Sequence, residues 1–111
     1  MDESIPILVL VRDLMFASRI SATARAENVA IKSVRDASQL AGEMGRRLII
    51  DLNQEGAIEA AAAWKQQQGG EVIGFVSHVD KATIDRAKAA GIDRVMPRSQ
   101  FVQLLPELLR A

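Results

Sequence analysis

The segment RLIIDLNQEG, residues 47–56, contains a short apolar run that ends on an acidic residue. Leu48, Ile49 and Ile50 would be apolar on both faces of an extended chain, and this pattern predicts a strand buried between two layers of helix. Asp51 follows at the carboxyl end of the strand, before a polar turn. It either caps the next helix or pairs with an arginine, or it belongs to an acidic site at the edge of a parallel sheet.

Similar apolar runs recur along the chain at nearly regular intervals. They cover residues 7–11, 29–34, 48–52, 72–77 and 94–96. The segments between them have helical spacing and good helix formers. Strands that are apolar on both faces and alternate with helices require a parallel sheet covered on both sides, with right-handed crossovers. We therefore predict an α/β fold, a three-layer doubly wound five-stranded parallel sheet of the flavodoxin-like kind, with residues 1–111 as a single domain.

The ends of the predicted helices carry recognisable signals. The helices are expected near residues 13–27, from residue 36 onward, and at 57–68, 80–90 and 99–110. Asp36 and Asp80 are predicted N-caps, and Gln39 completes a capping-box pattern with Asp36. Residues suited to a left-handed helix end follow at Asn28, Gly45, Gly69–Gly70 and Gly91. Pro106 predicts a bend or a division in the last helix.

The composition excludes several classes of protein. Fourteen acidic residues balance fourteen basic ones, and the longest basic run is Arg46–Arg47, so we expect neither nucleic-acid binding nor a polybasic membrane anchor. The chain has no cysteine and a single histidine, which excludes disulfides, zinc–thiolate sites and multi-histidine metal sites. No apolar run approaches the ~20 residues of a membrane span. We expect a cytoplasmic protein with a mainly aliphatic core.

Polar residues follow four of the predicted strands at their carboxyl ends. They are Arg12 and Asp13, Asp51 and Asn53, Ser77 and His78, and Pro97 and Arg98. In open α/β sheets, ligands bind at this edge, where the strand order reverses. Carboxylate and carbonyl oxygens are the ligands that Mg²⁺ prefers, and a hydroxyl with a cation suits phosphate oxygens. This edge is therefore the candidate site.

The chain resembles, over essentially its whole length, the receiver domain of bacterial response regulators, the CheY-like family. The resemblance rests on four motifs: VRDLMFASRI (11–20), LIIDLN (48–53), GFVSH (74–78) and AAGIDRVMPRS (89–99). It implies that Asp51 accepts a phosphoryl group from a histidine kinase. It also implies that Asp13, Asp51 and the carbonyl of Asn53 hold Mg²⁺, and that Ser77 and Arg98 occupy the family's hydroxyl and lysine positions.

The departures from the family pattern predict a weakened site. Arg12 replaces an acidic residue, and at ~4 Å with an effective dielectric of ~20 one charge is worth about 4 kcal/mol, so Mg²⁺ binding should suffer. Arg98 replaces a lysine, and its planar fork does not take the place of a compact ammonium. Val95 stands where the family has its switching aromatic residue. We expect Arg12 or Arg98 to pair with Asp51 or Asp13 in place of the metal.

Three functions remain open from the sequence. The favoured one is a degenerate pseudo-receiver, a protein-interaction module with weakened or lost phosphorylation. The second is a single-domain response regulator that is phosphorylated on Asp51 with Mg²⁺. The third is a ligand-binding or catalytic α/β domain, against which stands the absence of a Gly-rich phosphate loop after the first strand. Beyond self-catalysed phosphoryl transfer to Asp51, no enzyme activity is expected.

The expected partner is another protein, with a histidine kinase as one candidate, or a second copy of the chain. Binding is predicted through residues 81–110, because the last helix has more apolar residues than one buried stripe needs. Trp64 is interpreted as a core residue or a partner contact. His78 is either a solvated loop residue or a group that gates the site and makes it pH-sensitive.

Overall fold

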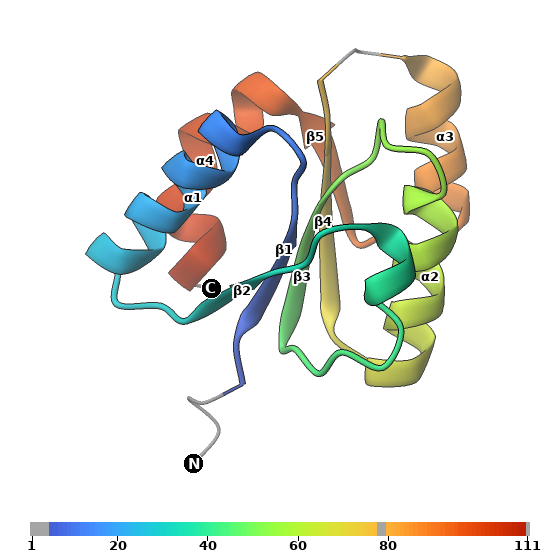
Figure 1. Cartoon of the computed structure of the whole chain (residues 1–111). Coiled ribbons are helices and arrows are strands. Elements are labelled where there is room, and N and C mark those ends of the chain that lie inside the picture. Colours follow the sequence, from blue (N-terminus) through green and yellow to red (C-terminus); the bar gives the residue numbers. More distant parts are fainter. Residues whose placement is uncertain (1–4, 78–79, 111) are drawn as a thin grey trace.

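Five parallel strands form one sheet, in the spatial order β2–β1–β3–β4–β5 (Figure 1). The computed structural model describes residues 5–77 and 80–110. The strands are β1 (Ile7–Leu10), β2 (Ile31–Ser33), β3 (Arg47–Asp51), β4 (Glu71–Val76) and β5 (Arg94–Pro97). Each overlaps the apolar run that predicted it, so the five-stranded parallel sheet is confirmed.

Helices cover both faces of the sheet. Helices α1 (Leu14–Ala26) and α4 (Arg98–Arg110) lie on one face, and α2 (Ala57–Gln68) and α3 (Lys81–Ala89) lie on the other (Figure 1). Alternate strand residues serve the two layers: Ile7 and Val9 pack with α1 and α4, whereas Leu8 and Leu10 pack on the other side. All four of these strand residues are buried, which explains why β1 is apolar throughout.

The prediction of a helix from residue 36 onward is wrong, because this segment forms only the short 3₁₀ turn η2 (Ala37–Gln39). Asp36 caps it through the N–H of Ser38, but Gln39 accepts the N–H of Arg35 at 3.2 Å, one residue before the capping-box position. Gly42 then adopts φ +81°, which an α-helix does not accommodate. The turn is fixed by packing instead, since Leu40 is buried.

Trp64 lies in the core beneath this irregular segment. Its indole N–H donates to the carbonyl of Glu43 at 2.9 Å, and its side chain is 1% exposed. The core interpretation of Trp64 is therefore confirmed, and the partner-contact interpretation is wrong. One tryptophan satisfies a backbone group of the loop that replaces the expected helix.

The other helix signals are mostly confirmed. Asp80 caps α3, and Asn28 and Gly69 take the left-handed conformation at φ 60° and 76°. Gly45 does not; its hydrogen is needed because a β-carbon there would collide with Leu8. Pro106 lies inside α4, which is not divided.

Arg47 fastens the last helix to the amino end of the sheet. It is 8% exposed, and its guanidinium donates to Glu71 Oε1 and to the carbonyl of Leu108, both at 3.0 Å. These bonds join β3, β4 and the last turn of α4. A buried carbonyl near a helix end needs such a donor, because a helix leaves its last carbonyls without intrahelical partners.

We predict that Arg47→Met lowers the free energy of unfolding by about 1–3 kcal/mol, since it leaves the Leu108 carbonyl buried without this donor. The neighbouring Arg46 is exposed and provides the matched control. Arg46→Met should change stability by less than about 0.5 kcal/mol. Urea melts of both variants measure the difference, and equal losses would contradict the role assigned to Arg47.

Candidate functional site

The strand order places a reversal point between β1 and β3. From β1 the chain moves outward to β2 and later returns to the other side of β1 as β3. Ligands of doubly wound sheets bind outside the carboxyl ends of the strands at this point. Asp13 follows β1 and Asp51 ends β3, so both acidic residues of the predicted site flank it.

Asp13 starts α1 and also pairs with Arg98. Its Oδ1 accepts the N–H groups of Met15 and Phe16 at 3.0 and 3.1 Å, as an N-cap does. Its Oδ2 lies 3.2 Å from Nη2 of Arg98. The N–H of Phe16 and the Arg98 guanidinium lower the pKa of Asp13 below its usual value of 3.8. One carboxylate thus both caps α1 and pairs with Arg98.

Arg98 is held in place by a second contact. Its guanidinium carbon lies 4.0 Å from the centre of the Phe16 ring, a cation–π geometry. Phe16 itself packs against Phe75 and Phe101 in the core. The Asp13–Arg98 pair therefore joins the loop after β1 to the first residue of α4. It is one of the arginine–acid pairings that the sequence predicted.

Arg12 lies elsewhere. It lines a groove on the β2 side, together with Ser33, Arg35 and Asp36. Among the described residues, neither Arg12 nor Arg98 forms an ion pair with Asp51. Of the four pairings that the sequence left open, the structure forms only Asp13–Arg98.

Asp51, Asn53 and Ser77 form a separate hydrogen-bonded group. The half-buried Asp51 accepts the N–H of Asn53 on Oδ1 at 3.0 Å. Asn53 in turn accepts the N–H of Ser77 on its side-chain oxygen at 2.6 Å. Leu52 is buried beside Gly74, where a β-carbon would collide with it, and this packing fixes the residue between Asp51 and Asn53. The group connects the carboxyl ends of β3 and β4.

Gln54 is the residue of this edge that sequence reasoning missed. Its side-chain amide donates to the carbonyl of Leu10 at 3.0 Å and to that of Asp51 at 3.2 Å. It therefore bridges the carboxyl ends of β1 and β3 at the reversal point. The one available signal was its place in the polar turn directly after a strand.

Asp13, one of the three ligands predicted for Mg²⁺, is engaged by the chain's own groups. Both oxygens of Asp13 are engaged, one by helix N–H groups and the other by a guanidinium. Asp51, a second predicted ligand, accepts the N–H of Asn53 on Oδ1. Within residues 5–77 and 80–110, no three Asp, Glu or His side chains cluster so that they could hold a metal ion. Coordination by Asp13 would require Arg98 to give up its carboxylate.

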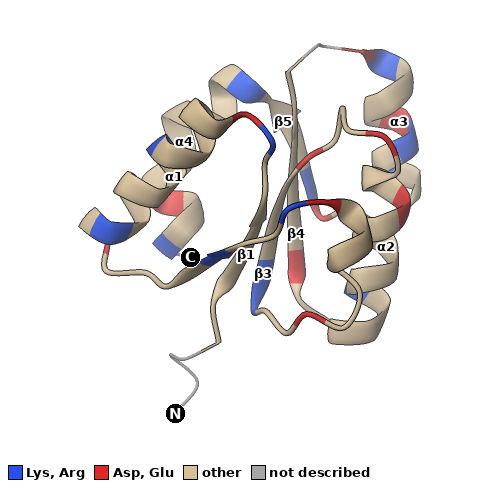
Figure 2. Cartoon of the chain, viewed as in Figure 1, with Lys and Arg blue, Asp and Glu red and all other residues tan. Residues whose placement is uncertain are grey.

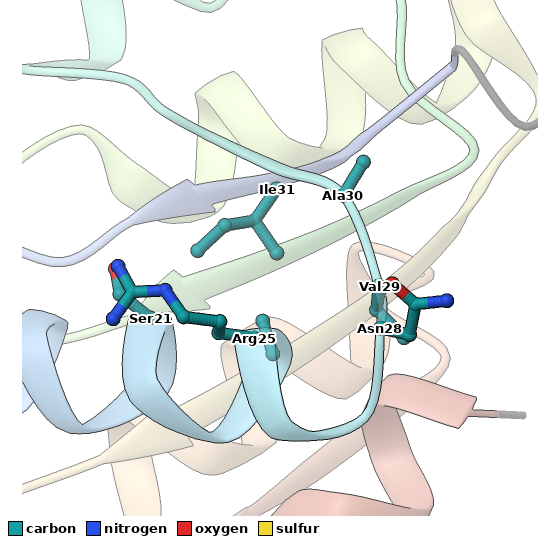
Figure 3. A pocket seen from close by; sticks show the side chains of 7 residues that line it. Ser21, Arg25, Asn28, Val29, Ala30 and Ile31 are labelled. Carbon is teal, nitrogen blue, oxygen red and sulfur yellow. The ribbon is translucent and has the colours of Figure 1, made fainter.

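Other parts of the surface do not extend this site. His78 lies outside the described residues. A groove of about 610 Å³ lies between the end of α1 and the start of β2, where Arg25 extends past Ile31 toward Ser21 (Figure 3). It is at the opposite end of β2 from the acidic residues. Positively and negatively charged residues are interspersed along the helices and loops (Figure 2), as the balanced composition predicted.

The apolar excess of the last helix is not exposed as a patch, so this premise for partner binding through residues 81–110 is wrong. Phe101, Leu105, Leu108 and Leu109 are buried, and the remaining apolar side chains are half-buried against the same core. The apolar face of α4 is wide because this helix packs on both the sheet and α1. In the part of the chain that the structure describes, the exposed large apolar side chains are Leu14, Met15 and Met44.

Comparison with known proteins adds structural neighbours. No protein-family model and no curated protein matches the sequence. A two-component response regulator from Clostridium difficile superposes with a TM-score of 0.81 at 8% identity, covering 96% of this chain and 93% of that one. A CheY-like receiver domain protein from Methanospirillum hungatei gives 0.78 at 13% identity, covering 96% and 94%.

A third neighbour is a response regulator from Burkholderia pseudomallei, solved with a phosphorylated aspartic acid, a calcium ion and citrate. Its TM-score is 0.74 at 15% identity, and the match covers 91% of this chain but 65% of that protein. None of the described helices is long and apolar enough to cross a membrane. The sheet order, the two helix layers and these neighbours show that the chain has the fold of CheY-like response regulator receiver domains.

Proposed function

We propose that the chain is a receiver-like signalling module that acts by binding another protein and in which phosphorylation of Asp51 is weakened or lost. The observation that carries this proposal is the Asp13–Arg98 ion pair. A working acidic site needs Asp13 available for a cation and a positive group available for the phosphoryl oxygens. Here these two groups neutralise each other.

Separating Asp13 from Arg98 costs free energy for both residues. Arg98 would lose its carboxylate and leave the Phe16 ring, where it is more than one-third exposed. An exposed pair of this kind contributes little stability alone, but the stacked ring and the capping bonds fix both partners in one geometry. A cation at Asp13 would also meet the positive guanidinium at close range, which weakens its binding.

Gln54 supports the same proposal from the other side of the crevice. Its amide occupies the space between the Leu10 and Asp51 carbonyls and supplies the bridge between β1 and β3. An entering ligand would have to displace it and leave two half-buried carbonyls to find new donors. The family resemblance implies that Asp13, Asp51 and Asn53 hold Mg²⁺. We therefore propose that Mg²⁺ binding at these three residues is weakened.

One observation favours a second candidate, a phosphorylatable response regulator. Asp51 is half-buried at the end of β3 and, among the described residues, its carboxylate accepts only the N–H of Asn53. Within the described ranges it is neither paired with a cation nor used as a helix cap. In this candidate a histidine kinase is the partner and Asp51 accepts the phosphoryl group despite the weakened metal site.

We predict that Arg98→Met raises the pKa of Asp13 toward its usual 3.8, but not fully, because the Phe16 and Met15 N–H bonds remain. A lowered pKa stabilises the folded state above the usual value, and this contribution is lost as the pH falls through the lowered one. The variant should lose part of it. Carbon-detected NMR titration of the carboxyl groups measures the shift.

Asp80 is the internal control for this titration, because the Thr83 hydroxyl and the Ala82 N–H, not Arg98, lower its pKa. Its pKa should be the same in both proteins. An unchanged pKa of Asp13 in Arg98→Met would show that the ion pair is not formed in solution.

The two candidate functions separate in a phosphorylation assay. The protein and Asp51→Asn are incubated with acetyl phosphate and MgCl₂, and intact mass is recorded; transfer would join a carboxylate oxygen of Asp51 to phosphorus and release acetate. We expect no phosphoryl adduct on the wild-type chain. Stoichiometric adduct on the wild type that is absent from Asp51→Asn would establish the second candidate instead.

A further inference from the structure

We propose that the N-terminal turn of α1 is a docking surface for an acidic, amphipathic helical segment of a partner protein. This inference rests on the proposed function, for which it names the partner surface. Its centre is the Leu14–Met15 knob, formed by two adjacent residues that are 82% and 86% exposed. They are two of the three large apolar side chains that the described part of the chain leaves exposed, and the third, Met44, is less exposed at 63%.

The fold does not account for the Leu14–Met15 knob. The start of α1 is secured by the Asp13 cap and by Phe16, which is 4% exposed. Acidic residues suit the first turn of a helix because they face the positive end of its dipole, yet this turn has none. Two apolar side chains stand where polar ones would serve the helix better, which is typical of a binding surface.

A groove adjoins each residue of the knob. Leu14 borders a groove of about 690 Å³ that is also lined by Val11, Arg12 and Arg35. Met15 borders one of about 350 Å³ that is lined by Phe16, Arg19 and Arg98. An apolar ridge between two grooves matches a helix whose apolar residues recur at one face and whose flanks lie in the grooves.

The charge around the knob indicates an acidic partner. Within the described residues, Arg98 is the one groove arginine with an ion pair. The hydroxyl of Ser38 and, less strongly, the charge of the nearby Arg12 lower the pKa of the Asp36 carboxyl. Arg19 and Arg35 form no ion pair in this part of the chain. Against these four cations stand Asp13 and Asp36, in a chain whose net charge is zero. The local excess is positive, so complementarity favours glutamate- and aspartate-rich flanks.

Two other occupants fit less well. In a symmetric dimer through this surface each copy would present the same arginines to its partner, and like charges would face each other. A nucleic acid would satisfy the arginines but has no apolar stripe for the Leu14–Met15 knob. The acidic amphipathic helix is the occupant that uses both the knob and the arginines.

The test uses a fluorescein-labelled peptide of about four helical turns, with leucine at i, i+3, i+4 and i+7 and glutamate elsewhere. Its matched control has lysine in place of every glutamate. Fluorescence anisotropy should show saturable binding of the acidic peptide to the full chain and about tenfold weaker binding of the lysine peptide. Leu14→Ser/Met15→Ser should weaken the acidic peptide by about tenfold or more, and Arg12→Glu/Arg19→Glu should weaken it and reduce its salt dependence.

Met44→Ser is the matched control variant, because Met44 is 63% exposed but lies outside both grooves. It should leave binding unchanged, and circular dichroism should show the same fold for all variants. Equal binding of the two peptides, no binding of the acidic peptide, or no loss in Leu14→Ser/Met15→Ser would overturn the proposal. The proposal would also be overturned by a dimer on size-exclusion chromatography that Leu14→Ser/Met15→Ser dissociates. So would single-stranded DNA that binds as tightly as the acidic peptide and whose binding Leu14→Ser/Met15→Ser does not change.

These outcomes are independent of phosphorylation. A chain that is phosphorylated on Asp51 and still binds the acidic peptide through the Leu14–Met15 knob would refute the proposed loss of phosphorylation and retain the docking surface. A chain that is not phosphorylated and does not bind the peptide would support the proposed loss of phosphorylation and refute the docking surface.

Discussion

A single carboxylate, that of Asp13, connects the start of the sheet to its last helix. One of its oxygens accepts two N–H groups and begins α1, and the other pairs with Arg98 at the first residue of α4. Because Arg98 also stacks on Phe16, the pair is anchored to the aromatic core between α1, α4 and the sheet. This contact fixes the geometry of the carboxyl end of β1 against the start of α4.

The rest of the carboxyl edge of the sheet is occupied by the chain's own groups. Gln54 joins the ends of β1 and β3, and Asn53 joins Asp51 to the N–H of Ser77 on β4. Hydrogen bonds and one ion pair thus hold together the strand ends that frame the crevice. In our account they replace the cross-links that a bound cation would provide, and they hold the module in one state, leaving binding to the surface around α1.

The fold was predictable because strand residues buried on both faces leave a strong pattern, as in residues 7–11 and 72–77. The helix after Asp36 was not, because the capping signal is local, whereas Gly42, Leu40 and the Trp64–Glu43 bond decide the conformation through tertiary packing. At the site, strand ends predicted where Asp13 and Asp51 lie, but not which arginine pairs with which acid. Gln54 could not be foreseen, since its role depends on how a short loop folds back over β1.

The central claim is that the crevice between β1 and β3 is closed by Arg98 and Gln54. The most direct measurement is a titration of the ¹⁵N-labelled protein with MgCl₂, following the backbone amides of residues 12–14 and 51–54, beside the double variant Arg98→Met/Gln54→Ala. The account predicts no saturable shifts in the wild type at millimolar Mg²⁺ and saturable shifts at these amides in the variant. Saturable binding to the wild type at these positions would contradict it.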